Sequence, residues 1–224
     1  MPPTVWDRLS SGYDRQLWLE RSAVRTAVAM LEPVVDARVL DVATGTGEVL
    51  RALARRPAPP GTVIGIDASA RMLAHVGGLP AGWGLRVGDA RALPFADGEF
   101  DLVTAAHVLH VLSPDDRARA LGEIHRVLTP GGRVVTVTPA VPPRGLARPV
   151  ARVLDQMAAR GPERYVGLRA FDPRAALRDA GLDVQAARWN VRGYPSVCVL
   201  ARRSAQVIRP REPERRDSNP RPPA

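Results

Sequence analysis

The stretch Arg38-Val-Leu-Asp-Val-Ala-Thr-Gly-Thr-Gly-Glu48 decides the fold of this chain. Its apolar run, residues 39–42, predicts a buried β-strand, and helix-spaced apolar residues follow from Glu48 to Arg55. The small residues between these segments predict a tight loop, because glycine tolerates a sharp turn and the close approach of a ligand. Strand, glycine loop and helix in this order are typical of sheets that bind a nucleotide-like ligand at their carboxyl edge.

A second acid, Asp67, ends the next apolar run and lies 20 residues after Gly47. Folds of this kind place a carboxylate there, and its two oxygens match the two hydroxyls of a ribose. Asp67 could equally be the N-cap of the helix expected from about Ser69. A dinucleotide fingerprint read from Gly45 would need glycine at position 50, where this chain has leucine. That departure disfavours a nicotinamide-dependent oxidoreductase.

The run from Asp41 to Gly47 resembles motif I, of the form D-x-x-x-G-x-G, of the class I S-adenosylmethionine-dependent methyltransferases. Ala43 stands where many members have another glycine. Four more segments resemble later motifs of the family in the same order: residues 65–73, 87–95, 100–110 and 128–135. The resemblance covers about residues 10–202 and is of the ubiquinone/menaquinone-biosynthesis type, which methylates small molecules. It implies a Rossmann-like α/β fold with a seven-stranded, mostly parallel sheet, helices on both faces and an antiparallel last strand.

The resemblance also implies S-adenosylmethionine as cofactor and assigns roles around it. The glycine loop would approach its methionine portion and Asp41 its amino group, while Asp89 and Ala90 would read the adenine. For Asp41 a plain turn cap, and for Asp89 a plain turn aspartate, are the alternatives, and Met72 is as compatible with a core position. The expected cofactor-binding residues are Tyr13, Asp41, Ala43, Thr44, Gly45, Gly47, Asp67, Ala68, Met72, Asp89, Ala90 and Ala105.

His107 and His110 follow the expected fourth strand, where the cofactor's methyl group would meet the acceptor. Either could be a general base for a phenol or enol, because imidazole titrates near neutral pH. We favour His110, since the strand-end position of His107 suits cofactor contact better. The spacing also allows one of the pair to be packing alone. No metal is expected, because further ligands are missing nearby.

The sequence thus predicts methyl transfer to the oxygen or carbon of a small molecule by direct displacement. One alternative is a noncatalytic or partner-dependent S-adenosylmethionine-binding protein. Another is a nucleic-acid methyltransferase, which usually carries an Asn/Asp-Pro-Pro-aromatic motif where this chain has Thr104-Ala-Ala-His107. The net charge of +9 does not favour nucleic acid, because all 32 basic residues are arginine, the tail after Ala201 contributes +4, and the remaining +5 is scattered.

Length and composition predict one domain over residues 1–203 and a disordered Pro/Arg-rich tail over 204–224. An N-terminal helix at about 13–31 and the irregular insert at 139–171 are expected to cover the substrate. The single cysteine, Cys198, excludes an intrachain disulfide and suits a reducing compartment. With neither a signal peptide nor a membrane span in the sequence, we expect a cytoplasmic protein; its oligomeric state stays open.

Overall fold

The protein is described by a computed structural model that covers residues 17–32, 35–160 and 169–204. Within these residues, strands combine into one seven-stranded sheet of order β3-β2-β1-β4-β5-β7-β6. β7 pairs antiparallel with both β5 and β6, and the other pairs are parallel. The strands are β1 (Arg38–Val42), β2 (Thr62–Asp67), β3 (Trp83–Val87), β4 (Phe100–Ala106), β5 (Leu128–Pro139), β6 (Leu182–Asn190) and β7 (Ser196–Arg203).

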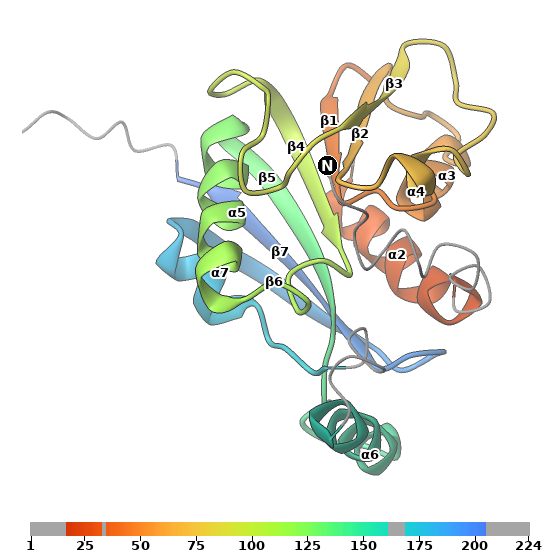
Figure 1. Ribbon diagram of the computed structural model, residues 1–224, viewed down its shortest axis with the longest axis vertical. Coiled ribbons are helices and arrows are strands. Elements are labelled where there is room, and N and C mark those ends of the chain that lie inside the picture. The colour runs from red at the N-terminus through yellow and green to blue at the C-terminus, as the bar shows by residue number, and fades with distance from the viewer. Residues whose placement is uncertain (1–16, 33–34, 161–168, 205–224) are drawn as a thin grey trace, which may run out of the picture.

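Helices cover both faces of this sheet (Figure 1). α2 and α3 pack against one face, whereas α5 and α7 pack against the other. α6 stands apart from the sheet, beyond the end of β5 (Figure 1). The helices are α2 (Leu17–Leu31), α3 (Glu48–Ala54), α4 (Ala70–Leu73), α5 (Pro114–Val127), α6 (Ala147–Arg160) and α7 (Arg174–Asp179).

The period of two along each strand builds two apolar layers, one on each side of the sheet. In β1, Val39 packs with α2 and α3, while its neighbour Leu40 packs with the α5 side. Both side chains are fully buried. Because the central parallel strands are covered on both faces, β1 and β4 read as nearly continuous apolar runs, which is why the sequence revealed them.

The predicted fold class is therefore confirmed, including the antiparallel last strand. Ser113 caps α5, since its hydroxyl accepts from the Asp116 N–H at 3.2 Å. The helix expected from about Ser69 is short: α4 ends at Leu73, and the glycines at 77 and 78 follow. The insert after β5, expected to be irregular, contains the helix α6 from Ala147 to Arg160.

Candidate functional site

The site lies where the strand order reverses. The chain passes from β1 to β2 and β3 on one side, then returns to place β4 on the other side of β1. In open α/β sheets, ligands bind in the crevice at such a point, outside the carboxyl ends of the strands. A cavity of about 290 Å³ opens there. It is lined by Ala43, Gly45, Ile66, Asp67, Ala68, Met72, Gly88, Asp89, Ala90, Arg91, Ala106, His107, Val108, Val111 and Leu112.

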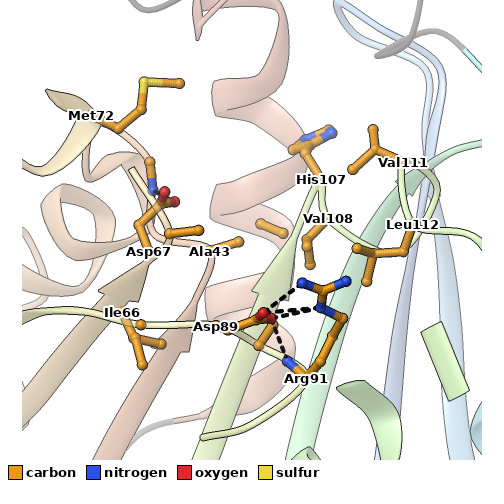
Figure 2. Close-up of a pocket in the computed structure, with 15 residues that line it drawn as sticks. Ala43, Ile66, Asp67, Met72, Asp89, Arg91, His107, Val108, Val111 and Leu112 are labelled. Carbon is orange, nitrogen blue, oxygen red and sulfur yellow. Dashed lines mark hydrogen bonds and ion pairs between the residues drawn. The ribbon is translucent and has the colours of Figure 1, made fainter. Parts of the chain in front are cut away.

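Figure 2 shows the two walls of this cavity. Met72 and Asp67 lie on one side, His107 and Val111 on the other, and Asp89 lies between them (Figure 2). Segments that follow β1, β2, β3 and β4 thus supply the lining. Four of the five motif segments that the sequence placed far apart converge on one ligand-sized space.

The loop after β1 makes its turn through left-handed backbone. Ala43, Gly45 and Gly47 have φ values of 57°, 54° and 87°. A Cβ on Gly47 would lie 3.0 Å from a methyl carbon of Val76, so this glycine permits close packing at the start of α3. A Cβ on Gly45 would meet no atom within 4 Å. Because Gly45 lines the cavity, its missing side chain leaves that space open to a ligand.

Asp67 ties the end of β2 to this loop. One carboxylate oxygen accepts from the Gly45 N–H at 2.8 Å, and the other accepts from the Ser69 N–H at 2.8 Å. The expected alternative, Asp67 as helix cap, is wrong in detail: Ser69 is the N-cap of α4, and its hydroxyl accepts from the Met72 N–H at 3.1 Å. The carboxylate still lines the cavity, so it can contact both the loop and a bound ligand.

Asp41 lies beneath the loop rather than in the wall of the cavity. Its side chain is 1% exposed, and its two oxygens accept from the hydroxyls of Thr44 and Thr104. Burial raises the pKa of Asp41 to about 7, because desolvation outweighs the two hydroxyl donors and the nearby Asp67 charge adds to it. Asp41 therefore connects the loop to β4 and carries a carboxyl group that titrates near neutrality.

Asp89 makes an interaction that the sequence did not predict. Its two carboxylate oxygens accept from the guanidinium of Arg91 at 2.7–3.0 Å, as Figure 2 shows, and Arg91 also reaches Asp116 at 3.0 Å. The Arg91 hydrogen bonds hold the pKa of Asp89 below its usual range. Asp89 thus stays ionised on the cavity wall and links the segment after β3 to the start of α5.

The two histidines occupy different spaces. His107 lines the main cavity and a smaller hollow beside it, where its Nε2 lies 4.0 Å from a carboxylate oxygen of Glu20 on α2. His110 is 4% exposed and lines a second cavity of about 310 Å³ with Arg117, Arg169 and others. Val111 and Leu112 border both cavities, so the two spaces adjoin.

Most residues predicted to bind the cofactor are brought together by the fold. Thr44 lines the smaller hollow with Gly45. Ala105 lies in the core, and its neighbour Ala106 lines the cavity instead, because adjacent strand residues face opposite ways. Tyr13 lies outside the described residues. Predicted residues that line the main cavity are Ala43, Gly45, Asp67, Ala68, Met72, Asp89, Ala90 and His107.

Sequence reasoning missed part of the lining. Arg91 lies two residues after Asp89, a spacing that gave no signal before the turn was known. Val108, Val111 and Leu112 belong to the loop after β4, where their apolar character resembled ordinary packing. In the part of the chain that the structure describes, no helix could span a membrane, and no three His, Cys, Asp or Glu residues cluster as a metal site would.

This architecture, with a glycine loop after β1 and an acid at the end of β2, is typical of Rossmann-like proteins that bind nucleotide-type ligands at the switch point. Solved structures share the fold. Magnesium protoporphyrin IX methyltransferase from Synechocystis, with bound SAH, superposes with a TM-score of 0.65 at 19% identity, covering 89% of this chain and 98% of that one. The [4+2]-cyclase SpnF superposes with a TM-score of 0.64 at 19% identity, covering 83% and 82%.

Within this class of Rossmann-like proteins, sequence comparison points to methyltransferases. Residues 39–132 match the family described as a methyltransferase domain. The chain is 38% identical over 158 residues to a demethylmenaquinone methyltransferase of Lactiplantibacillus plantarum, covering 65% of each protein. It is 42% identical over 136 residues to the Thermus thermophilus enzyme of that name, covering 59% of this chain and 60% of that protein. These matches support a class I S-adenosylmethionine-dependent methyltransferase of the ubiquinone/menaquinone-biosynthesis type.

Proposed function

We propose that this protein transfers a methyl group from S-adenosylmethionine to a small hydroxylated aromatic acceptor, at carbon or oxygen. The observation that carries the proposal is the convergence of Gly45, Asp67 and Asp89 on one cavity at the switch point. The matched segments cover about three-fifths of the two curated relatives named above. The names of these relatives refer to demethylmenaquinone, so we propose a quinol-type ring as the acceptor of this protein.

The residues present fit the cofactor. The open space at Gly45 leaves room for the methionine portion, and the Asp67 carboxylate supplies acceptor oxygens for ribose hydroxyls. Ala68, Met72 and Ile66 form an apolar wall on which an adenine ring would lie. When bound, S-adenosylmethionine supplies a methyl group already activated on a sulfonium. The protein then has to align the acceptor with that group and exclude water.

The second cavity is the natural place for the acceptor. It adjoins the first at Val111 and Leu112, and His110 lies in its wall. We assign His110 as the general base: its imidazole would take the proton of an acceptor hydroxyl and so raise the electron density of the ring. His107, beside Glu20 and the glycine loop, contacts the cofactor side instead.

Calorimetry with S-adenosylhomocysteine, S-adenosylmethionine and NAD tests the binding half of the proposal. We expect both adenosyl ligands to bind and NAD not to bind. Gly45→Ala should weaken binding at least roughly tenfold, because its methyl group enters the cavity. Gly78→Ala is the matched control: its φ is 64° and its added Cβ also meets nothing within 4 Å, but Gly78 does not line the cavity. Equal losses in both variants, or binding of NAD alone, would refute the proposed cofactor site.

Transfer of a labelled methyl group to hydroxylated aromatic acceptors tests the catalytic half. His110→Ala should lower turnover by roughly 10²-fold or more and leave cofactor affinity unchanged. His107→Ala, measured in parallel, should mainly weaken cofactor binding. Cofactor binding without transfer to any acceptor would favour a noncatalytic or partner-dependent binding protein. Full turnover in His110→Ala would leave alignment as the mechanism and refute the base assignment.

A further inference from the structure

Helix α6 carries an exposed apolar stripe that methyl transfer does not use. Val150, Val153 and Met157 recur at helical spacing, and Leu146 lies four residues before Val150. The exposed fraction is 97% for Leu146, 56% for each valine and 37% for Met157. One face of α6, continued by Leu146 just before the helix begins, thus presents four large apolar side chains to solvent. Contiguous groups of this kind mark interaction surfaces.

Another face of α6 is fixed to the body of the protein. Ala151 and Ala158 are buried, and the Asp155 carboxylate accepts from the Ala170 N–H at 2.9 Å. The helix stands beyond the end of β5, away from the sheet (Figure 1). Its inner side is therefore held in place, while the apolar stripe stays accessible to a partner.

Arginines accompany the stripe. Arg144 precedes the helix, Arg148 and Arg152 lie on its polar face, and Arg160 lies in its last turn beside the stripe. All four are exposed, and none forms an ion pair with a described residue. Asp155, the acid of this helix, is directed toward Ala170. The outer surface of α6 is therefore apolar and cationic together.

We propose that α6 docks this protein on a membrane surface that contains anionic lipid. A helix with bulky apolar residues on one face, arginines on the other and low overall hydrophobicity lies in the plane of a lipid interface. Its apolar side chains enter the acyl boundary, and the guanidinium groups reach the lipid phosphates. This proposal stands whether or not the protein transfers methyl groups.

A second copy of the chain fits this face less well. Two paired α6 stripes would bring two sets of arginines together, and like charges repel. Four side chains also cover much less than the roughly 800 Å² per partner that a stable interface buries. Anionic lipid phosphates neutralise the same arginines, so charge and area both favour lipid.

The helix that carries the stripe also borders the second cavity. Ala158, on the inner side of α6, lines the second cavity together with His110 and Phe171. Docking through the outer side of α6 would hold that cavity close to the lipid surface. An apolar acceptor dissolved in the membrane would then have a short path into the protein.

Vesicle co-sedimentation tests the docking. The full chain should bind vesicles of phosphatidylcholine mixed with phosphatidylglycerol, and it should bind vesicles of phosphatidylcholine alone much more weakly. Binding to the mixed vesicles should weaken as the salt concentration is raised. The triple variant Val150→Gln, Val153→Gln, Met157→Gln should lose roughly tenfold or more of this binding, because glutamine keeps the helix but removes the apolar face. Val35→Gln is the matched control, since Val35 is 52% exposed and lies just before β1, far from α6 in the sequence.

The arginines after residue 204 are present in wild type and variants alike, so they cancel in this comparison. Circular dichroism should show equal helix content in all three proteins, which separates loss of docking from loss of folding. Equal vesicle binding by wild type and the triple variant would overturn the proposal. So would a dimer, seen by sedimentation velocity, that the triple substitution abolishes while no vesicles are bound.

Discussion

Asp41→Asn should change how the stability of this protein depends on pH. The Asp41 carboxyl is buried at the end of β1, and burial raises its pKa from 3.8 to about 7 in the folded protein. Folding therefore favours the protonated form. The contribution of Asp41 to stability is fully present below about pH 4 and is lost as the pH rises through 7. The asparagine variant has no proton to lose at this position.

The magnitude follows from the two pKa values. Each tenfold change in proton affinity is worth ~1.4 kcal/mol, so ionising Asp41 costs about 4 kcal/mol more in the folded protein than in the unfolded chain. By the linkage relation, about 2.5 kcal/mol of stability is lost between pH 5 and pH 8 through the ionisation of Asp41. Over that range, the unfolding free energy of Asp41→Asn should rise by about 2.5 kcal/mol relative to wild type. Urea unfolding at matched pH values measures the difference.

Thr104→Val supplies a second, independent check. The Thr104 hydroxyl donates to Asp41 at 2.6 Å, and this bond lowers the pKa of the carboxyl. Removing the donor while keeping the shape of the side chain should move the titration of Asp41 to higher pH, which carbon-detected NMR of the carboxyl group would follow. Parallel stability curves for wild type and Asp41→Asn, with no movement in Thr104→Val, would refute the reasoning.

Three further substitutions test the loop and the packing behind it. Asp67→Ala should weaken S-adenosylhomocysteine binding by about 2–3 kcal/mol in calorimetry, because charge-assisted bonds are lost; unchanged affinity would remove Asp67 from the site. Ala43→Gly should raise the unfolding free energy by about 0.5–1 kcal/mol. A φ of 57° strains alanine, and relief of this strain outweighs the extra chain entropy that glycine loses on folding; a lower Tm would contradict this. Gly193→Ala should lower the unfolding free energy by about 3 kcal/mol or more, because the new Cβ would lie 2.2 Å from the Leu19 carbonyl oxygen; an unchanged Tm would show that the segment moves aside freely.

Much of the site could be read from the sequence because backbone order fixes it. Asp67 ends β2 and Ala43 follows β1, and parallel neighbours necessarily bring their carboxyl ends together. Spacing along the chain is enough to place residues of this kind. The helix start at Ser113 is of the same kind, because the cap depends only on the next three or four residues.

Other features depend on which of two adjacent strand residues faces the cavity, or on the conformation of a side chain, and the sequence could not predict them. β4 runs to Ala106, so the alternation of the strand sends Ala105 into the core and leaves Ala106 at the cavity. The guanidinium of Arg91 folds back onto Asp89 only because the turn after β3 brings the two side chains together. The role of a residue at the end of an element is thus less predictable than the existence of the element.

Backbone strain supports the location of the site independently of the motifs. Among the described residues, three that are not glycine have positive φ, and two of them, Ala43 and His107, line the same cavity. Such conformations cost of order 1–3 kcal/mol each and persist only where the surroundings hold them. The His107 N–H donates to the Val137 carbonyl at 2.8 Å, and Gly45, two residues after Ala43, is tied to Asp67. The strain is therefore concentrated on the facing ends of β1 and β4, where any ligand bound at the switch point must lie.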